Sequence, residues 1–165
     1  MRYRIACLWA LLLAGGCGLG SFDVTEAVAP QTIPGGSSAA AAASSLFETT
    51  MTFNWDDLPT GKSWANAVTL RSAAFHVTSP PQGTFDFVES VVLFISAPSS
   101  TTLTDVQIAS GQATPGSGTL TLTPTAPVDL LRYVKAGAVV RAVGKGTQPA
   151  ATTTFDGQVV LTVHL

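Results

Sequence analysis

Short runs in which apolar and polar side chains alternate limit most strongly how this chain can fold. In residues 47–55 the large side chains Phe47, Met51, Phe53 and Trp55 fall on alternate positions, separated mainly by polar residues. Alternation with a period of two places every second side chain on the same face of an extended segment. We therefore predict a strand over residues 47–55 with one buried face.

The end of the sequence repeats this pattern. Every second residue of the segment 159–165 is Val or Leu, which predicts a strand over residues 158–165. Asp156 and Gly157 precede this strand, and an Asp-Gly pair accepts the positive φ angles of a type I′ turn. We predict a two-residue hairpin turn there, between residues 153–155 and the last strand.

Further segments carry enough apolar residues to form strands. In residues 68–77 the apolar side chains change parity midway, so a strand here needs a β-bulge near Arg71 and Ser72 to keep both groups facing inward. Residues 91–96 form an almost continuous apolar run, which predicts a central strand with both faces covered. Weaker runs rich in β-branched residues predict strands at 106–109, 119–123 and 138–143.

One short helix interrupts these strands. Asp129 can cap its N-terminus, Leu130, Leu131 and Val134 share one face, and Gly137 can end it. About seven short strands with polar turns predict an all-β fold, a two-sheet antiparallel sandwich of immunoglobulin-like or related Greek-key type with one short helix. The Cys, Trp and Cys pattern of antibody domains is absent, so the sequence leaves the exact topology open.

The start of the sequence has the layout of a secretory signal. Arg2 and Arg4 give a basic beginning, and an uncharged run over residues 5–14 is rich in Leu and Ala. A basic segment, an apolar segment and small residues follow one another in this order in signal peptides. The apolar run has about half of the roughly 20 residues that a membrane-spanning helix needs. We therefore expect residues 1–16 to be removed.

The residues before Cys17 resemble the bacterial lipobox, in which a leucine and small residues precede a cysteine that receives diacylglycerol on its sulfur. Leu13, Ala14, Gly15 and Gly16 stand before Cys17, with the leucine one position further from the cysteine than in the commonest form. The resemblance implies cleavage before Cys17 and lipidation of its thiol, which would hold the protein on a membrane. The alternative is an ordinary cleaved signal with an incidental cysteine nearby.

Two neighbouring residues refine this expectation. Cys7 lies inside the apolar run and leaves with it, so Cys17 is the only cysteine of the mature chain and no disulfide can form within it. Gly18 stands where some inner-membrane lipoproteins carry Asp. The resemblance therefore implies a cell-envelope location, with the outer membrane favoured over the inner one by analogy.

The composition changes at residue 45. Residues 17–45 are rich in Gly, Ser, Ala and Pro, which predicts a lipid-anchored tether of low complexity followed by one sandwich domain over residues 46–165. Phe22, Val24 and Ile33 are apolar enough to pair with the edge of the domain. An integrated first strand is therefore the alternative to a tether.

The charge balance and the missing motifs exclude several classes of function. Once Arg2 and Arg4 are removed, six basic and ten acidic residues remain, without the basic stripe that phosphate recognition requires, so no nucleic-acid partner is expected. The signatures of serine hydrolases, zinc proteases and P-loop nucleotide binders are also absent. We expect no enzymatic activity, no cofactor and no metal.

A few side chains remain candidates for chemistry. His76 and His164 both alternate with core-facing neighbours, so we expect them to face solvent rather than to act in catalysis. Asp56 with Asp57, and Asp86 with Glu89, offer oxygen ligands for calcium, but neither pair has the loop spacing of a known calcium motif. Turn-forming or capping roles are favoured for these acids.

The tryptophans and the glycines can each be interpreted as structural or as functional residues. Trp55 and Trp64 could form a platform for stacking a sugar, but we favour core positions because large aromatic residues usually supply core area. Five glycines are predicted to mark turns rather than a phosphate-binding loop, because no strand-to-helix unit follows them. They are Gly111, Gly116, Gly118, Gly144 and Gly146.

Three further segments carry a resemblance. Residues 22–24 read Phe-Asp-Val, residues 33–35 read Ile-Pro-Gly, and residues 85–91 read Phe-Asp-Phe-Val-Glu-Ser-Val. Together with the signal, they make the chain similar to short envelope lipoproteins of the kind found in myxobacteria. The resemblance covers much of the length and implies a location rather than a particular activity.

Two functions from different classes follow from these observations. The first is a lipid-anchored, non-catalytic envelope module that makes structural or binding contacts, which requires no deep internal cavity. The second is a carrier of lipid or another apolar ligand, because the low charge and the runs of Ala and Val could line a cavity between the sheets.

Overall fold

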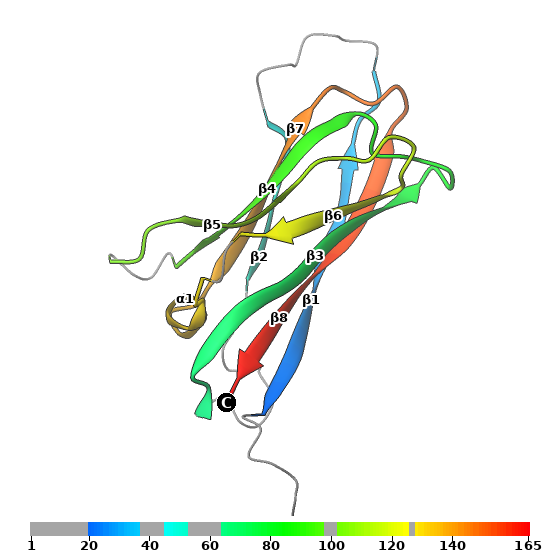
Figure 1. The fold of residues 1–165 in the computed structure, drawn as a ribbon. Coiled ribbons are helices and arrows are strands. Elements are labelled where there is room, and N and C mark those ends of the chain that lie inside the picture. The colour runs from blue at the N-terminus through cyan, green and yellow to red at the C-terminus, as the bar shows by residue number, and fades with distance from the viewer. Residues whose placement is uncertain (1–19, 37–44, 53–63, 98–101, 126–127) are drawn as a thin grey trace, which may run out of the picture.

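Eight strands and one short helix make up the described part of the protein (Figure 1). The structure is a computed structural model that describes residues 20–36, 45–52, 64–97, 102–125 and 128–165. In chain order the elements are β1 (Ser21–Ile33), β2 (Ser45–Thr52), β3 (Ala67–Ser79), β4 (Val88–Ser96), β5 (Val106–Gly111), β6 (Thr119–Pro124), α1 (Leu131–Lys135), β7 (Val139–Gly146) and β8 (Thr153–His164).

The strands lie in the order β1-β8-β3-β6-β5-β4-β7-β2, and every pair is antiparallel. β1, β8, β3 and β6 form one layer, called sheet A below, and β2, β7, β4 and β5 form the other, called sheet B. Eight strands connected in this way make a jelly roll, which consists of two Greek keys. The predicted all-β, two-sheet antiparallel sandwich is confirmed, and its strand order is that of a jelly roll rather than an immunoglobulin domain.

β6 joins the two sheets. Its residues Thr119 to Leu122 pair with β3, whereas Thr123 and Pro124 pair with β5. The two edge strands of the continuous sheet, β1 and β2, contact each other on the other side of the core. The eight strands therefore enclose one core almost as a barrel does.

Most of the predicted strands are confirmed. Those predicted at 47–55, 106–109, 119–123, 138–143 and 158–165 correspond to β2, β5, β6, β7 and β8, although residues 53–55 lie outside the described part of the chain. The bulge predicted in the strand 68–77 is also present, because the pairing of β3 with β8 shifts register between Leu70 and Ser72. The shift keeps Val68, Ala73 and Phe75 in the core despite their different parity.

β4 is a central strand, as predicted, because it lies between β5 and β7. The prediction that both of its faces are covered is wrong. Val91, Leu93 and Ile95 are buried, whereas Val92 and Phe94 are half-buried on the opposite face. One face of an antiparallel sheet in a sandwich faces solvent, so half of an apolar run must lie outside the core. There the guanidinium of Arg141 lies 5.0 Å from the centre of the Phe94 ring and shields it.

β1 corrects the tether that composition predicts for residues 17–45. Residues 21–33 pair with β8 from Ser21 opposite His164 to Ile33 opposite Thr153, so they form an integral edge strand of sheet A. Val28 and Ile33 are buried in the core. Pro30 is tolerated because it sits at a register shift in an edge strand, where no second neighbour needs its missing N–H. Residues 17–19 and 37–44 lie outside the described residues.

The hairpin turn predicted at Asp156 and Gly157 is also wrong. β8 runs without interruption from Thr153 to His164, and Gly157 pairs with Phe75 of β3 on one side and Val28 of β1 on the other. A Cβ atom on Gly157 would lie 2.6 Å from the Ala74 carbonyl oxygen and 2.7 Å from the Phe75 ring. Glycine is present here because two backbones and a ring approach closely, rather than because the chain turns.

The predicted helix is confirmed as α1, but its N-cap residue is Leu130 rather than Asp129, and no side chain caps it. Asp129 Oδ1 accepts a hydrogen bond from the N–H of Leu131 at 2.9 Å and one from the N–H of Val68 at 3.1 Å. Leu130 also donates its N–H to the Val68 carbonyl oxygen at 2.8 Å, so the entry to the helix is attached to β3. Gly137 follows the helix with a φ of 79°, the conformation that commonly ends a helix.

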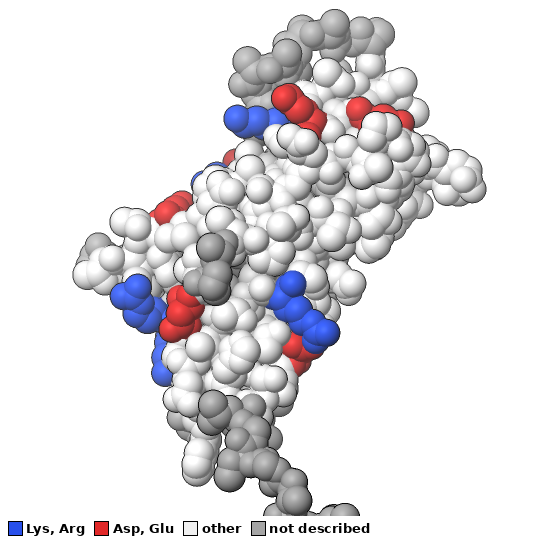
Figure 2. Space-filling view, in the orientation of Figure 1, with Lys and Arg blue, Asp and Glu red and all other residues white. Residues whose placement is uncertain are grey.

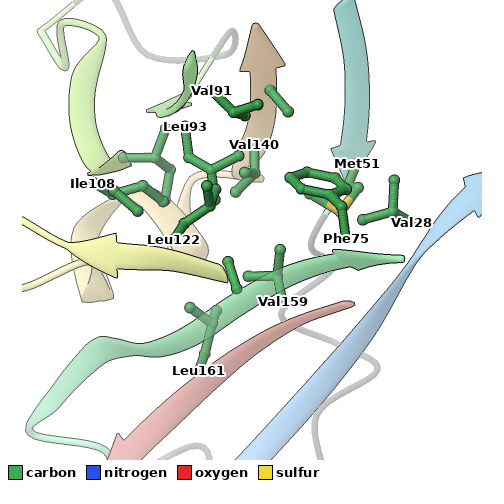
Figure 3. Close-up of a cluster of buried hydrophobic side chains, with 14 of the residues drawn as sticks. Val28, Met51, Phe75, Val91, Leu93, Ile108, Leu122, Val140, Val159 and Leu161 are labelled. Carbon is green, nitrogen blue, oxygen red and sulfur yellow. The ribbon is translucent and has the colours of Figure 1, made fainter. Parts of the chain in front are cut away.

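Four phenylalanine rings form the centre of the core. The Phe155 ring lies 4.8 Å from that of Phe47 and 5.8 Å from those of Phe75 and Phe85, measured between centroids. Phe47 belongs to sheet B, whereas Phe75 and Phe155 belong to sheet A, so the rings connect the two layers. Val91, Leu93, Ile108, Leu122 and Val140 extend this core along the sandwich (Figure 3).

Replacing Phe155 with alanine is expected to lower the free energy of unfolding by about 3–5 kcal/mol, because it leaves a cavity among three other rings. Urea unfolding followed by circular dichroism measures this loss. Phe94→Ala, on the half-buried outer face, is the matched control with a smaller loss. Equal losses for the two variants would contradict the central position of the ring cluster.

Gly157→Ala is expected to destabilise the fold by about 1–3 kcal/mol, because the added methyl group must displace backbone or the Phe75 ring. The urea midpoint measures this change. Gly20→Ala is the control, since a Cβ there meets only the Leu165 side chain at an ordinary 3.4 Å. A Gly157→Ala protein as stable as Gly20→Ala would show that β3 and β8 do not approach as described.

Candidate functional site

Three strands of sheet A end side by side at one end of the molecule. β1, β3 and β8 have 13, 13 and 12 residues, longer than any strand of sheet B, and they extend beyond it toward the C-terminal residue (Figure 1). β1 and β3 begin here, and β8 ends here. We call this end, with Gly20, Trp64, Asn66, His164 and Leu165, the β1 end.

Two backbone hydrogen bonds hold the β1 end together. The N–H of Leu165 donates to the Gly20 carbonyl oxygen at 2.8 Å, and the N–H of Asn66 donates to the His164 carbonyl oxygen at 2.8 Å. The segments that lead into β1 and β3 are therefore both fixed to the end of β8. No local pattern in the sequence signals these bonds, because they join residues about 100 or more positions apart.

Side chains on the outer face of sheet A connect the same three strands. Thr162 on β8 donates its hydroxyl to Asp23 Oδ1 on β1 at 2.8 Å, and Arg71 on β3 forms an ion pair with Asp23 Oδ2. The Arg71 side chain is largely exposed, so solvent screening keeps the contribution of this ion pair to stability small. The bonds align the three strands next to the β1 end.

Trp64 is exposed, which corrects the prediction that it belongs to the core. Its relative accessibility is 77%, whereas the next residue, Ala65, is buried. The segment before β3 enters the core at Ala65 and leaves Trp64 outside. Trp55 lies outside the described residues, so its predicted core position stays a prediction.

Cys17, the predicted lipidation site, also lies outside the described residues. In the sequence it precedes Gly20 by three positions, which limits the distance between their Cα atoms to about 11 Å. Within the described part of the chain, no helix has the length and apolar character to cross a membrane.

The two histidines are half-buried on the outer face of sheet A, as predicted from their parity. His76 Nδ1 lies 3.1 Å from Thr119 Oγ1, and His164 Nε2 lies 3.1 Å from Thr69 Oγ1. Each bond joins neighbouring strands, β3 with β6 or β8 with β3. Both imidazoles thus take part in cross-strand contacts.

Two of the cavities on the described surface adjoin strands of sheet A. One, of about 650 Å³, lies at the register shift of β1 and is lined by residues that include Val28, His76 and Asp156. The other, of about 330 Å³, lies where β6 leaves β3 and is mostly apolar, with Leu70, Ile108 and Leu130 in its wall. The first brings one imidazole and one carboxylate onto neighbouring strands, since His76 pairs with Asp156.

Asp86, a predicted calcium candidate, instead joins two loops. Its Oδ1 accepts a hydrogen bond from the Gly116 N–H at 2.6 Å, and its Oδ2 accepts one from the Thr84 hydroxyl at 2.8 Å. Asp86 lies before β4 and Gly116 lies before β6, so the carboxylate connects the β3–β4 and β5–β6 loops. This is the turn-forming role favoured from the sequence.

Glu89 is the one other acidic calcium candidate in the part of the chain that the structure describes. Glu89 is exposed on β4, and Asp56 and Asp57 lie outside the described residues. In the ranges that the structure describes, no three His, Cys, Asp or Glu side chains come together as metal ligands.

The glycines predicted to mark turns divide into two groups. Gly116 has a φ of 74° in the β5–β6 loop, which confirms a turn, and Gly118 follows in the same loop. Gly111 ends β5, and Gly144 and Gly146 belong to β7, so these three lie in strands. A Cβ on Gly144 would clash with the Phe47 ring, which explains why β7 has glycine there.

Comparisons with known proteins add little to this geometry. No protein-family model matches the chain, and no curated protein matches it. The decameric BFDV capsid protein is similar at a TM-score of 0.41 and 11% identity, over 88% of this chain and 97% of that chain. The mud crab tombus-like virus structure is similar at a TM-score of 0.27 and 12% identity, over 88% and 89%. Scores of this size carry no argument, so the fold assignment rests on the strand order.

The two hydrogen bonds to Asp86, first the one from Gly116 and then the one from Thr84, hold the pKa of its carboxyl below the ordinary value of 3.8. A carboxyl whose pKa is lowered in the folded protein stabilises the folded state at pH values above its ordinary pKa. This stabilisation is lost as the pH falls through the lowered pKa. Asp86→Asn is therefore expected to lower the urea midpoint at about pH 6 and to have a smaller effect at about pH 3.

Glu89→Gln is the matched control for Asp86→Asn, because it removes an exposed carboxylate three residues away. Its urea midpoints are expected to follow those of the unmodified protein at both pH values. An Asp86→Asn protein with unchanged midpoints would show that the carboxylate does not hold the two loops together.

Proposed function

We propose that this protein is a lipid-anchored protein of the cell envelope, attached to the outer membrane through Cys17, and that its jelly-roll domain is a non-catalytic structural or binding module. The proposal combines the expected removal of residues 1–16 with the lipobox-like residues before Cys17. Membrane attachment would then come from lipid alone.

The observation that best supports this proposal is the short distance along the chain between Cys17 and the fold. β1 begins at Ser21, so only three residues separate the predicted lipid site from the first strand. A cysteine at the margin of a folded domain, behind an apolar leader with small residues at its end, suits an anchor that holds the domain directly on a membrane.

The roles of the polar side chains favour a module without catalysis. His76, His164 and Asp86 each form hydrogen bonds that connect strands or loops. Catalytic groups need oriented partners that point toward a substrate site, whereas these groups point toward their structural partners. Binding through loops or sheet faces would leave these bonds intact.

The packing between the sheets disfavours the alternative, a carrier of an apolar ligand. Phe75, Phe85 and Phe155 are almost completely buried and occupy the centre of the space that a carried lipid would need. Of the two cavities described above, the larger lies on sheet A at the register shift of β1, and the smaller opens to solvent where β6 passes from one sheet to the other. Native mass spectrometry that detects a lipid bound noncovalently to protein purified from its host would support the carrier over the proposed module.

The test of the proposal is metabolic labelling of the full chain with radioactive palmitate in bacterial cells. We expect the mature protein to carry the label and to stay in the membrane fraction through a high-salt wash, because two or more acyl chains make attachment close to permanent. Cys17→Ser is expected to lose the label and to be released by the wash.

Cys7→Ser is the matched control, because Cys7 belongs to the segment expected to be removed. It should keep both the label and the attachment. An unlabelled mature protein that washes free of membranes would overturn the proposed function.

A further inference from the structure

Trp64 is the exposed large apolar side chain in the described part of the chain, with a relative accessibility of 77%. A single exposed apolar residue is ordinary in a soluble protein. Tryptophan is a special case, because its ring has an apolar body and one N–H, a combination enriched at the level of lipid headgroups. The location of Trp64 in the fold therefore decides what its exposure means.

The backbone beside Trp64 is held firmly in place. Ala65 is 8% exposed and packs into the core, and the N–H of Asn66 donates to the His164 carbonyl oxygen. These two contacts fix the chain directly after Trp64 to the end of β8. The side chain thus projects from a rigid part of the β1 end.

The predicted lipid site is close to this end along the sequence. Leu165 bonds to the Gly20 carbonyl oxygen, and Gly20 is at most about 11 Å along the chain from the Cα of Cys17. A tether over residues 17–45 would instead reach roughly 100 Å when extended. The headgroup region on each side of a bilayer is about 5–8 Å thick, so the short connection leaves the β1 end at the membrane surface.

The chemistry of the β1 end suits this location. The described segments that form it, residues 20–22, 64–70 and 162–165, contain no Asp, Glu, Lys or Arg. Most of the described surface seen in Figure 2 carries no such residue either. Approaching the headgroups therefore requires no charged side chain of these segments to lose its water.

We propose that the β1 end rests on the surface of the membrane that holds Cys17, with the Trp64 ring among the lipid headgroups. This inference rests on the proposed lipidation and adds an orientation to it. The Cys17 lipid fixes the distance to the bilayer, and Trp64 fixes which side of the sandwich faces it. The loops at the opposite end, which Asp86 connects, then point away from the membrane and are free to meet partners.

Tryptophan fluorescence of the full lipidated protein in phosphatidylcholine vesicles tests this orientation. In Trp55→Phe, Trp64 is the only tryptophan left after residues 1–16 are removed. We expect lipids brominated near the headgroup to quench its emission, and acrylamide in the water to quench it about two-fold less than in unanchored Cys17→Ser protein. If Trp55→Phe does not fold, Trp64→Phe replaces it. The difference in emission between the unmodified protein and Trp64→Phe then reports the quenching of Trp64.

The matched control moves the reporter to the opposite end. In Trp55→Phe with Trp64→Phe and Gln82→Trp, the tryptophan sits in the exposed turn between β3 and β4. Its emission should be insensitive to brominated lipid and fully sensitive to acrylamide. Equal quenching by lipid at both ends would overturn the proposed orientation.

Two other outcomes would overturn the inference while leaving the lipid anchor in place. In the first, the protein is labelled with palmitate and bound to the membrane, but acrylamide quenches Trp64 as strongly as in Cys17→Ser. This would show that the β1 end does not contact the bilayer. Protection from acrylamide without quenching by brominated lipid would show that protein rather than lipid covers Trp64. Loss of palmitate labelling, in contrast, overturns the proposed function first.

Discussion

The packing of phenylalanine rings between the sheets is the interaction on which the other features of this fold depend. Phe47, Phe75 and Phe155 come from three strands that are distant in sequence, and their rings meet at centroid distances of 4.8 to 6.3 Å. A side chain larger than that of glycine on a neighbouring strand would occupy the space that these rings fill. Gly144 lies against the Phe47 ring and Gly157 against the Phe75 ring, so the rings and the glycines are complementary in shape.

This core determines which parts of the chain meet at the surface. Because β8 lies between β1 and β3, the start of β1, the start of β3 and the end of β8 come together, and Gly20 bonds to Leu165. Trp64 stays outside because Ala65 is the residue that enters the core. Trp64 and Gly20, the first described residue after Cys17, thus share one end of the sandwich through the strand order rather than through any local motif.

The expectations from sequence hold where a local pattern carries the information. The change of parity around Arg71 predicts the bulge in β3, and Gly137 predicts the end of α1. They fail where a distant partner decides. The sequence predicts a turn at Gly157, whereas the structure has Gly157 in a strand against the Phe75 ring. It also predicts a tether that includes residues 21–33, whereas these residues pair with β8. The position of Trp64 likewise depends on a hydrogen bond between Asn66 and His164, which no neighbouring residue reveals.

By itself, the sequence determined the all-β class, the two-sheet arrangement and most of the strands, because a period of two in hydrophobicity directly records which face of a strand is buried. It also marked Cys17 as the residue that would carry lipid. Only the tertiary structure decided the jelly-roll order, the place of β1 in sheet A and the gathering of Gly20, Trp64 and Leu165 at one end. Strand order and close approach between backbones depend on contacts between residues far apart in the chain, and a local pattern holds no record of them.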